Sequence, residues 1–232
     1  MAQLWKIRLP DGRTLVPGDW TTANPLFSVV EVPTGTWNVL SAFSHGFGGD
    51  VPGSVGPRKS NFTDTNLQGE GGKLPENEEL VVYNIQVEAY TKYGAGELAV
   101  DTYPSPDEPD VSLLNMLRLQ RDILVQMRIA AVKSYTAQPL SYFGAGTGVN
   151  RYCSPSRTVL SAGAEGSVIS NNGMTEVGSE RTLASPLYVG PGDVMGVDFM
   201  PGPGEVEDLV LDTNGRIELR VFLNGYRRRP VA

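Results

Sequence analysis

Apolar and polar residues alternate most clearly near the end of the sequence. Residues 194–199 and 217–224 each place every second side chain on one face. A period of two residues is typical of a β-strand with one face in a core. Turn-forming sequences at 190–193 and 214–215 precede the two runs, so we predict two strands of antiparallel type. The predicted apolar faces are Met195, Val197 and Phe199 in the first strand, and Ile217, Leu219, Val221 and Leu223 in the second.

Two central segments follow the same pattern. Residues 79–91 predict a long strand, and residues from Asp122 toward Lys133 predict another. In the second segment the apolar positions are Ile123, Val125, Met127 and Ile129. In the first, one predicted face holds Val81, Tyr83, Ile85, Val87 and Ala89, and the opposite face holds Val82, Asn84, Gln86 and Glu88.

The remaining elements have weaker signals. Residues 3–9 and 13–16 predict a hairpin through a Pro-Asp-Gly turn, and the residues between Pro25 and Pro33 predict an edge strand. Asp110 is placed to cap a short helix over 111–121. Further strands are predicted at 36–43, 157–160 and 167–170.

Together these elements predict an all-β fold, an antiparallel β-sandwich of jelly-roll type with long loops and one short helix. A parallel α/β sheet would need a helix after each strand, which this sequence does not offer. We expect a single roll in one domain, residues 1–232. Residues 1–61 supply N-terminal strands and a Gly/Pro-rich loop at 44–61. A loop of that length in a compact domain is typical of an interaction surface or a mobile segment.

Composition narrows the function classes. The net charge is −7, which disfavours direct, sequence-specific nucleic-acid binding because such proteins need a basic surface. Cys153 is the only cysteine, so no internal disulfide can form. The N-terminus has no signal-peptide pattern, and no apolar run approaches the ~20 residues that span a bilayer, so we expect synthesis in the cytosol.

Catalytic chemistry has few candidates. His45 is the only histidine, and a nucleophilic site would have to combine it with Cys153 or a serine. Neither local sequence has the strand-turn-helix form of a nucleophile elbow, so a solvated loop histidine without a catalytic role is expected. One histidine cannot supply a cupin-type metal site. The glycine runs at 69–72 and 144–148 lack the Gly-Lys-Ser/Thr ending of a P-loop.

Charged and aromatic clusters leave alternatives open. The acidic clusters at 76–79, 107–110 and 205–208, and Asp64, are candidate calcium ligands, although solvated surface carboxylates are the favoured interpretation. The tryptophans Trp5, Trp20 and Trp37 are either a sugar-binding platform or, as we favour, core or contact residues. A basic tail, Arg227, Arg228 and Arg229, has three alternatives: contact with a phosphate, contact with an acidic patch on a neighbour, or no contact, and we favour the neighbour.

The order of several sequence phrases resembles a known family. FTDTNLQGEGGKLP, DILVQMRIAAVKSYTAQPLSYFGAGTG and SPLYVGPGDVMGVDF are similar to segments of jelly-roll major capsid proteins from tailless icosahedral viruses of bacteria and archaea. The closing phrase "L-x-G-x-x-R-x-V" of that family is matched by Leu223, Gly225, Arg228 and Val231. The resemblance extends over residues 62–231.

The resemblance implies a structural coat protein that assembles into capsomers of an icosahedral shell, as a trimer or pseudo-hexamer. Its implied partners are copies of itself, other capsid proteins and an internal membrane, and its implied location is the virion capsid after synthesis in the host cytoplasm. No catalytic, cofactor or metal site is expected, and the protein is not expected to be an enzyme. The alternative is a carbohydrate- or receptor-binding β-sandwich, such as a phage fibre or decoration protein.

Overall fold

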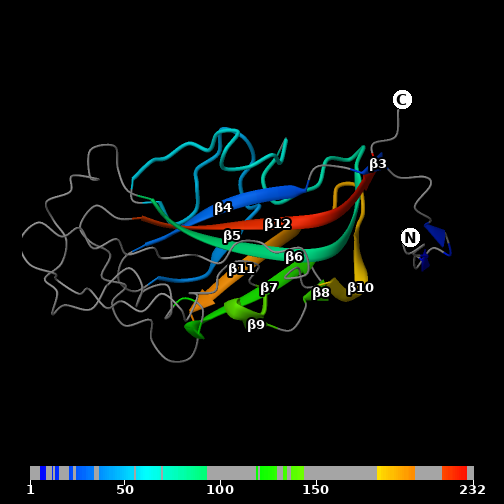
Figure 1. The fold of residues 1–232 in the computed structure, drawn as a ribbon. Coiled ribbons are helices and arrows are strands. Elements are labelled where there is room, and N and C mark those ends of the chain that lie inside the picture. The colour runs from blue at the N-terminus through cyan, green and yellow to red at the C-terminus, as the bar shows by residue number, and fades with distance from the viewer. Residues whose placement is uncertain are drawn as a thin grey trace, which may run out of the picture.

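The computed structural model in Figure 1 describes fourteen stretches of the chain. These are residues 6–8, 12, 14–15, 21–22, 25–33, 37–54, 56–68, 70–92, 119, 121–129, 133–134, 137–143, 182–201 and 216–228. The strands are β1 (Ile7–Arg8), β2 (Thr14–Leu15), β3 (Thr21–Thr22), β4 (Leu26–Val32), β5 (Leu40–Ala42), β6 (Glu79–Lys92), β7 (Ile123–Ile129), β8 (Lys133–Ser134), β9 (Gln138–Pro139), β10 (Thr182–Val189), β11 (Met195–Pro201) and β12 (Arg216–Arg228).

The strands form two antiparallel sheets that pack as a sandwich (Figure 1). In the first sheet the order is β10-β6-β12-β4. The short strand β3 lies on the same side of β12 as β4 and pairs with the C-terminal end of β12, past the part that pairs with β4. In the second the order is β5-β11-β7, and β8 and β9 pair with opposite ends of β7. Each sheet therefore has four strand positions. If the eight positions are lettered B to I along the chain, the sheets read B-I-D-G and C-H-E-F. This order confirms the predicted antiparallel sandwich of jelly-roll type.

The core lies between the two sheets and is filled by the alternating apolar positions. The predicted inward faces of β7, β11 and β12 are confirmed, because all of their apolar residues are buried in one cluster. Fully burying a side chain of this size contributes about 1.5–3 kcal/mol. The intervening residues point outward, and one of them, Asp198, receives hydrogen bonds from Arg128 and Ser41.

Strand β6 departs from the predicted faces in its first half. Ile85 and Val87 lie in the core as predicted, but Leu80 and Val82 accompany them, whereas Val81 does not belong to the core cluster. The cause is a β-bulge. Asn84 pairs with Asn224, but the next pair is Val82 with Gly225, so Tyr83 is an extra residue on β6. An extra residue exchanges inward and outward positions on one side of the bulge.

The weaker predictions have mixed outcomes. The hairpin is present as β1 paired with β2, and β4 is an edge strand of its sheet, both as predicted. The strand predicted at 36–43 is shorter, Leu40–Ala42. A 3-10 turn, η2 (Leu140–Tyr142), was not predicted. Among the described residues the backbone is also helical at Leu119, Arg121 and Asp122. The rest of the predicted helix and the strands predicted at 157–160 and 167–170 lie outside the described residues.

Candidate interaction surface

A long connection between β5 and β6 crosses the outer surface of β4 and β12 (Figure 1). We call residues 43–54, 56–68 and 70–74 the covering segment. It runs along the open edge of β4, where the amide of Glu31 donates to the carbonyl of Pro52 at 2.9 Å. The amide of Phe27 donates to Oδ1 of Asn66 at 2.8 Å, and the amide of Asn66 donates to the carbonyl of Phe27. The segment predicted as a long loop is therefore a layer packed on the first sheet.

One arginine joins the covering segment to the sheet. Nη1 of Arg58 donates to Oε1 of Glu31 on β4 and, at 2.9 Å, to Oε1 of Glu218 on β12. Its Nη2 donates to Oδ1 of Asp64 within the segment. All three carboxylate side chains are almost completely buried, and Arg58 itself is 18% exposed. Buried carboxylates of this kind require a charged, hydrogen-bonded partner, so Arg58 fixes the segment to both strands, in addition to the bonds along β4.

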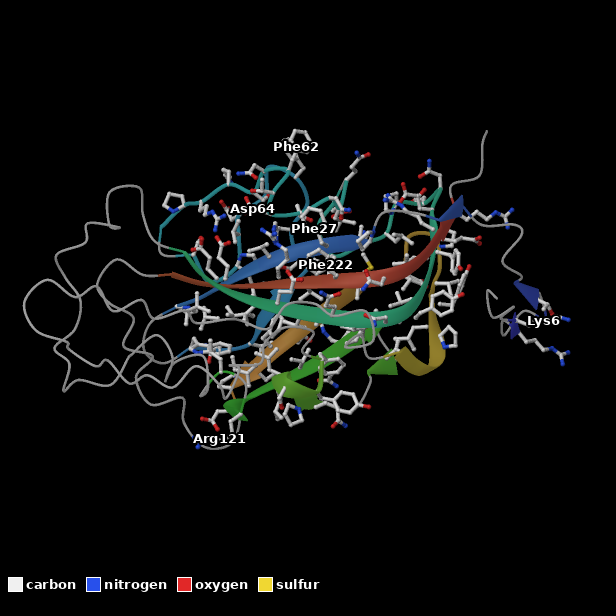
Figure 2. All side chains as sticks on the ribbon, in the orientation of Figure 1. Lys6, Phe27, Phe62, Asp64, Arg121 and Phe222 are labelled. Carbon is white, nitrogen blue, oxygen red and sulfur yellow. The ribbon has the colours of Figure 1, made fainter. Side chains whose placement is uncertain are left out.

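Two phenylalanines stand on the outer surface of this layer. Phe47 is 52% exposed and Phe62 is 77% exposed, and their rings stack with centroids 4.5 Å apart. In Figure 2, Phe62 points away from both sheets, and Asp64 lies between it and β4. The turn that carries Phe62 is held by Asp64, whose Oδ2 accepts from the amide of Asn61 at 2.9 Å. Because Asp64 is also bound by Arg58, the turn that carries the exposed Phe62 ring is held in place.

The same layer buries the only histidine. His45 is 5% exposed, and neither ring nitrogen has a hydrogen-bond partner within the described part of the chain. Burial lowers the pKa of His45 from 6.5, and attraction to the Asp64 carboxylate opposes this with a smaller effect. The prediction of a solvated loop histidine is therefore wrong, because the side chain is buried. No described serine accepts or donates a hydrogen bond at the imidazole, and Cys153 lies outside the described residues.

No family model, curated protein or solved structure matches this chain. The two four-stranded antiparallel sheets establish the fold, and the family resemblance rests on the sequence phrases alone. In the stretches that the structure describes, no helix has the length and apolar character that a membrane crossing requires.

The basic tail and one acidic cluster meet each other within this chain. Nε of Arg227 donates to Oε2 of Glu78 at 2.7 Å, and Glu78 is fully buried. Arg228 lies 3.8 Å from Glu79. Arg227 and Arg228 therefore have carboxylate partners in their own chain, and contact of the tail with a neighbouring molecule stays a prediction. Arg229 lies outside the described residues.

The structure describes only some of the other residues that the sequence offered as candidate ligands or contacts. Asp64 is bound by Arg58, and the described residues contain no cluster of three or more His, Cys, Asp or Glu side chains suited to a metal ion. Trp37 is buried in the core cluster, and Trp5 and Trp20 lie outside the described residues. Within the first glycine run, a side chain at Gly71 would overlap the carbonyl of Ser44, so this glycine serves close packing. The second run, 144–148, and the acidic clusters at 107–110 and 205–208 are not described.

Sequence reasoning missed the residues that build this surface. Phe47 and Phe62 are fifteen positions apart, and nothing in their local sequences indicates that the rings stack. Glu31 and Glu218 occupy ordinary outward positions of their strands, and Arg58 lies in a glycine- and proline-rich stretch. The one usable signal was the length of the loop at 44–61, which is typical of an interaction surface or a mobile segment.

Proposed function

We propose that this protein is a structural viral coat protein that assembles with copies of itself into the capsomers of an icosahedral shell. The observation that carries the proposal is the stacked pair Phe47 and Phe62, exposed on a covering segment that Arg58 fixes to the sheet. Exposed aromatic side chains on a fixed base are typical of protein contacts. The jelly-roll strand order and the family resemblance of residues 62–231 support the same function.

The size of this patch fits a contact that is weak by itself. A phenylalanine side chain contributes roughly 200 Å² when buried, so the exposed parts of the two rings amount to roughly 250 Å². A stable pairwise interface needs about 800 Å² from each partner. The pair can therefore be the centre of a contact, with polar surface around it. In a closed symmetric shell many such contacts act together, so none has to be strong in isolation.

The alternative function has less support. A carbohydrate- or receptor-binding module would use exposed aromatic rings as a platform for sugar rings. Of the three tryptophans considered for that role, Trp37 is buried in the core cluster. The stacked Phe47 and Phe62 cover each other's faces in part, which leaves less open ring surface for a sugar.

Light scattering after size exclusion, followed by electron microscopy, tests the proposal on the full chain. We expect oligomers or closed shells that grow with protein concentration. Phe47→Ser combined with Phe62→Ser should abolish them, whereas Val39→Ser should not. Val39 is as exposed as Phe47 but precedes β5 in the other sheet. A wild-type protein that stays monomeric at every concentration, alone and with the other coat proteins of its virus, would overturn the function. Assembly that survives the double substitution would overturn only the role of the two rings.

A further inference from the structure

His45 occupies a site that accepts a neutral imidazole. Both ring nitrogens are buried and lack partners among the described residues. The backbone closes around the residue: a Cβ atom at Gly49 would lie 3.0 Å from the His45 Cβ, and one at Gly71 would overlap the His45 Cα. A neutral ring loses hydrogen bonds to water in such a site, but a protonated ring loses far more, because a buried charge needs a partner.

The carboxylate that attracts the imidazole is already bound. Asp64 attracts the imidazole electrostatically. However, its Oδ1 accepts from Arg58 and its Oδ2 accepts from the amide of Asn61. Asp64 cannot turn toward a protonated His45 without weakening one of these two bonds. Both bonds lie within the covering segment and order it, and the Arg58 guanidinium that binds Asp64 also binds the sheet at Glu31 and Glu218. Either response to protonation therefore acts against the closed layer.

Other charged groups around the segment are paired elsewhere. On the sheet side, Glu31 and Glu218 bind Arg58, and Nη2 of Arg220 donates to the carbonyl of Thr63. On the solvent side, two exposed ion pairs join Lys59 to Asp50 and Lys73 to Glu70. Within the segment, Asp64 is the carboxylate that attracts the His45 ring electrostatically.

The middle of the segment, residues 44–54 and 56–66, can open without unfolding the sandwich, whereas its flanking residues Phe43, Leu67 and Leu74 belong to the core cluster and stay in place. Its backbone bonds to β4 are at Phe27 and Glu31, whereas β12 is paired along its length with both β4 and β6. Opening would expose Val29, which is completely buried outside the core cluster, and the ring pair of Phe27 and Phe222. Figure 2 shows these two rings on the outer side of β4 and β12 below the covering segment.

We propose that the covering segment is an acid-sensitive layer: protonation of His45 opens it and exposes the outer face of β4 and β12. The unfolded or open segment binds a proton at about pH 6.5, as an ordinary histidine does, whereas the closed segment resists protonation. The closed form is therefore fully stable above that pH and loses stability as the pH falls below it. The inference concerns the folded chain itself and does not depend on the proposed function.

Two measurements on the full-length protein test this. Because the chain has a single histidine, proton NMR titration of the imidazole reports on His45 alone. We expect a pKa below 6.5. Hydrogen exchange then reports on opening through the amides of Glu31 and Ser60, which bond to Pro52 and Gly49. After correction for the intrinsic pH dependence of exchange, their protection should fall by up to tenfold per pH unit below about 6.5.

The control amides lie in the β7–β11 pairing, for example at Asp198 and Gln126, which lie opposite each other, and their protection should stay constant over the same range. In His45→Gln the segment amides should lose the pH dependence, because glutamine does not titrate. An unchanged dependence in this variant would overturn the proposal. So would equal loss of protection in the control amides of the wild type. If His45→Gln fails to fold, the wild-type titration still decides, since a pKa at or above 6.5 would contradict the inference.

Discussion

Glu31 and Glu218 lie directly opposite each other across β4 and β12, and the same guanidinium nitrogen of Arg58 donates to both carboxylates. Two like charges at directly opposed positions of a sheet repel each other. Here the repulsion is offset by a cation that comes from another part of the chain. The sheet and the covering segment therefore stabilise each other, because the guanidinium of the segment binds both carboxylates of the sheet.

Arg58→Met should lower the free energy of unfolding by about 3 kcal/mol, since it removes a cation that three buried carboxylates share. Lys59→Met is the matched control. Lys59 is the next residue, and its ion pair with Asp50 is exposed, so its loss should cost less than about 1 kcal/mol. Urea unfolding followed by circular dichroism measures both. Equal costs for the two variants would refute the central role of Arg58.

Gly53 and Gly56 both have a positive φ, but they differ in the space around them. A Cβ atom at Gly53 would overlap the carbonyl oxygen of Glu31, whereas one at Gly56 has no neighbour within 4 Å. Both alanine variants bear the strain of a left-handed backbone, about 1–2 kcal/mol. Gly53→Ala should cost about 1–3 kcal/mol more because of the overlap. Thermal and urea unfolding of the two variants checks the difference, and similar stabilities would mean that the segment is not packed against β4 as described.

Arg227 and Arg228 are neighbours with unequal ion pairs. Arg227→Met removes the cation beside the fully buried Glu78 and should cost about 3 kcal/mol. Arg228 is 40% exposed and lies 3.8 Å from Glu79, so Arg228→Met should cost less than about 1 kcal/mol. The comparison is made by chemical unfolding at neutral pH. If Arg228→Met proves the more damaging change, the assignment of the basic tail to these partners is wrong.

Tyr83 should contribute to stability at neutral pH and lose that contribution in alkali. Burial raises its pKa above the ordinary value of 10, and the neighbouring Tyr226 adds to this effect. The folded state therefore holds the phenol neutral, and its advantage is lost as the pH rises above about 10. In Tyr83→Phe this part of the pH dependence should disappear. Absorbance titration of tyrosinate gives the direct check. In the difference between the wild-type and variant spectra, the tyrosinate absorbance of Tyr83 should appear only above pH 10.

The sandwich could be predicted because β7, β11 and β12 follow a strict two-residue period, and β6 follows it in its second half. Residues such as Val197 and Leu219 occupy core positions in the structure as the alternation requires. The first half of β6 could not be predicted from alternation, because the bulge at Tyr83 depends on its pairing with Asn224 and Gly225. A strand partner more than a hundred residues away leaves no local trace in the sequence.

The interaction surface could be predicted only as a location. The glycine and proline content of residues 44–61 indicated a long loop, but not that it packs on β4. Its organisation depends on Arg58 reaching glutamates on two strands that are distant in sequence, and on His45 being enclosed by that packing. Such contacts follow from the tertiary structure, so neither the buried histidine nor the stacked rings could be read from spacing.

The bonds between β4 and the covering segment also limit the ways in which molecules can join. A strand from a second molecule extends a sheet only where it finds open N–H and C=O groups. At this margin Phe27 and Glu31 already give such groups to Asn66 and Pro52. A second copy can therefore meet this side only through side chains, and fibril growth by strand addition is blocked here. Contacts made by side chains can end at a closed assembly of fixed size, whereas added strands would continue without limit.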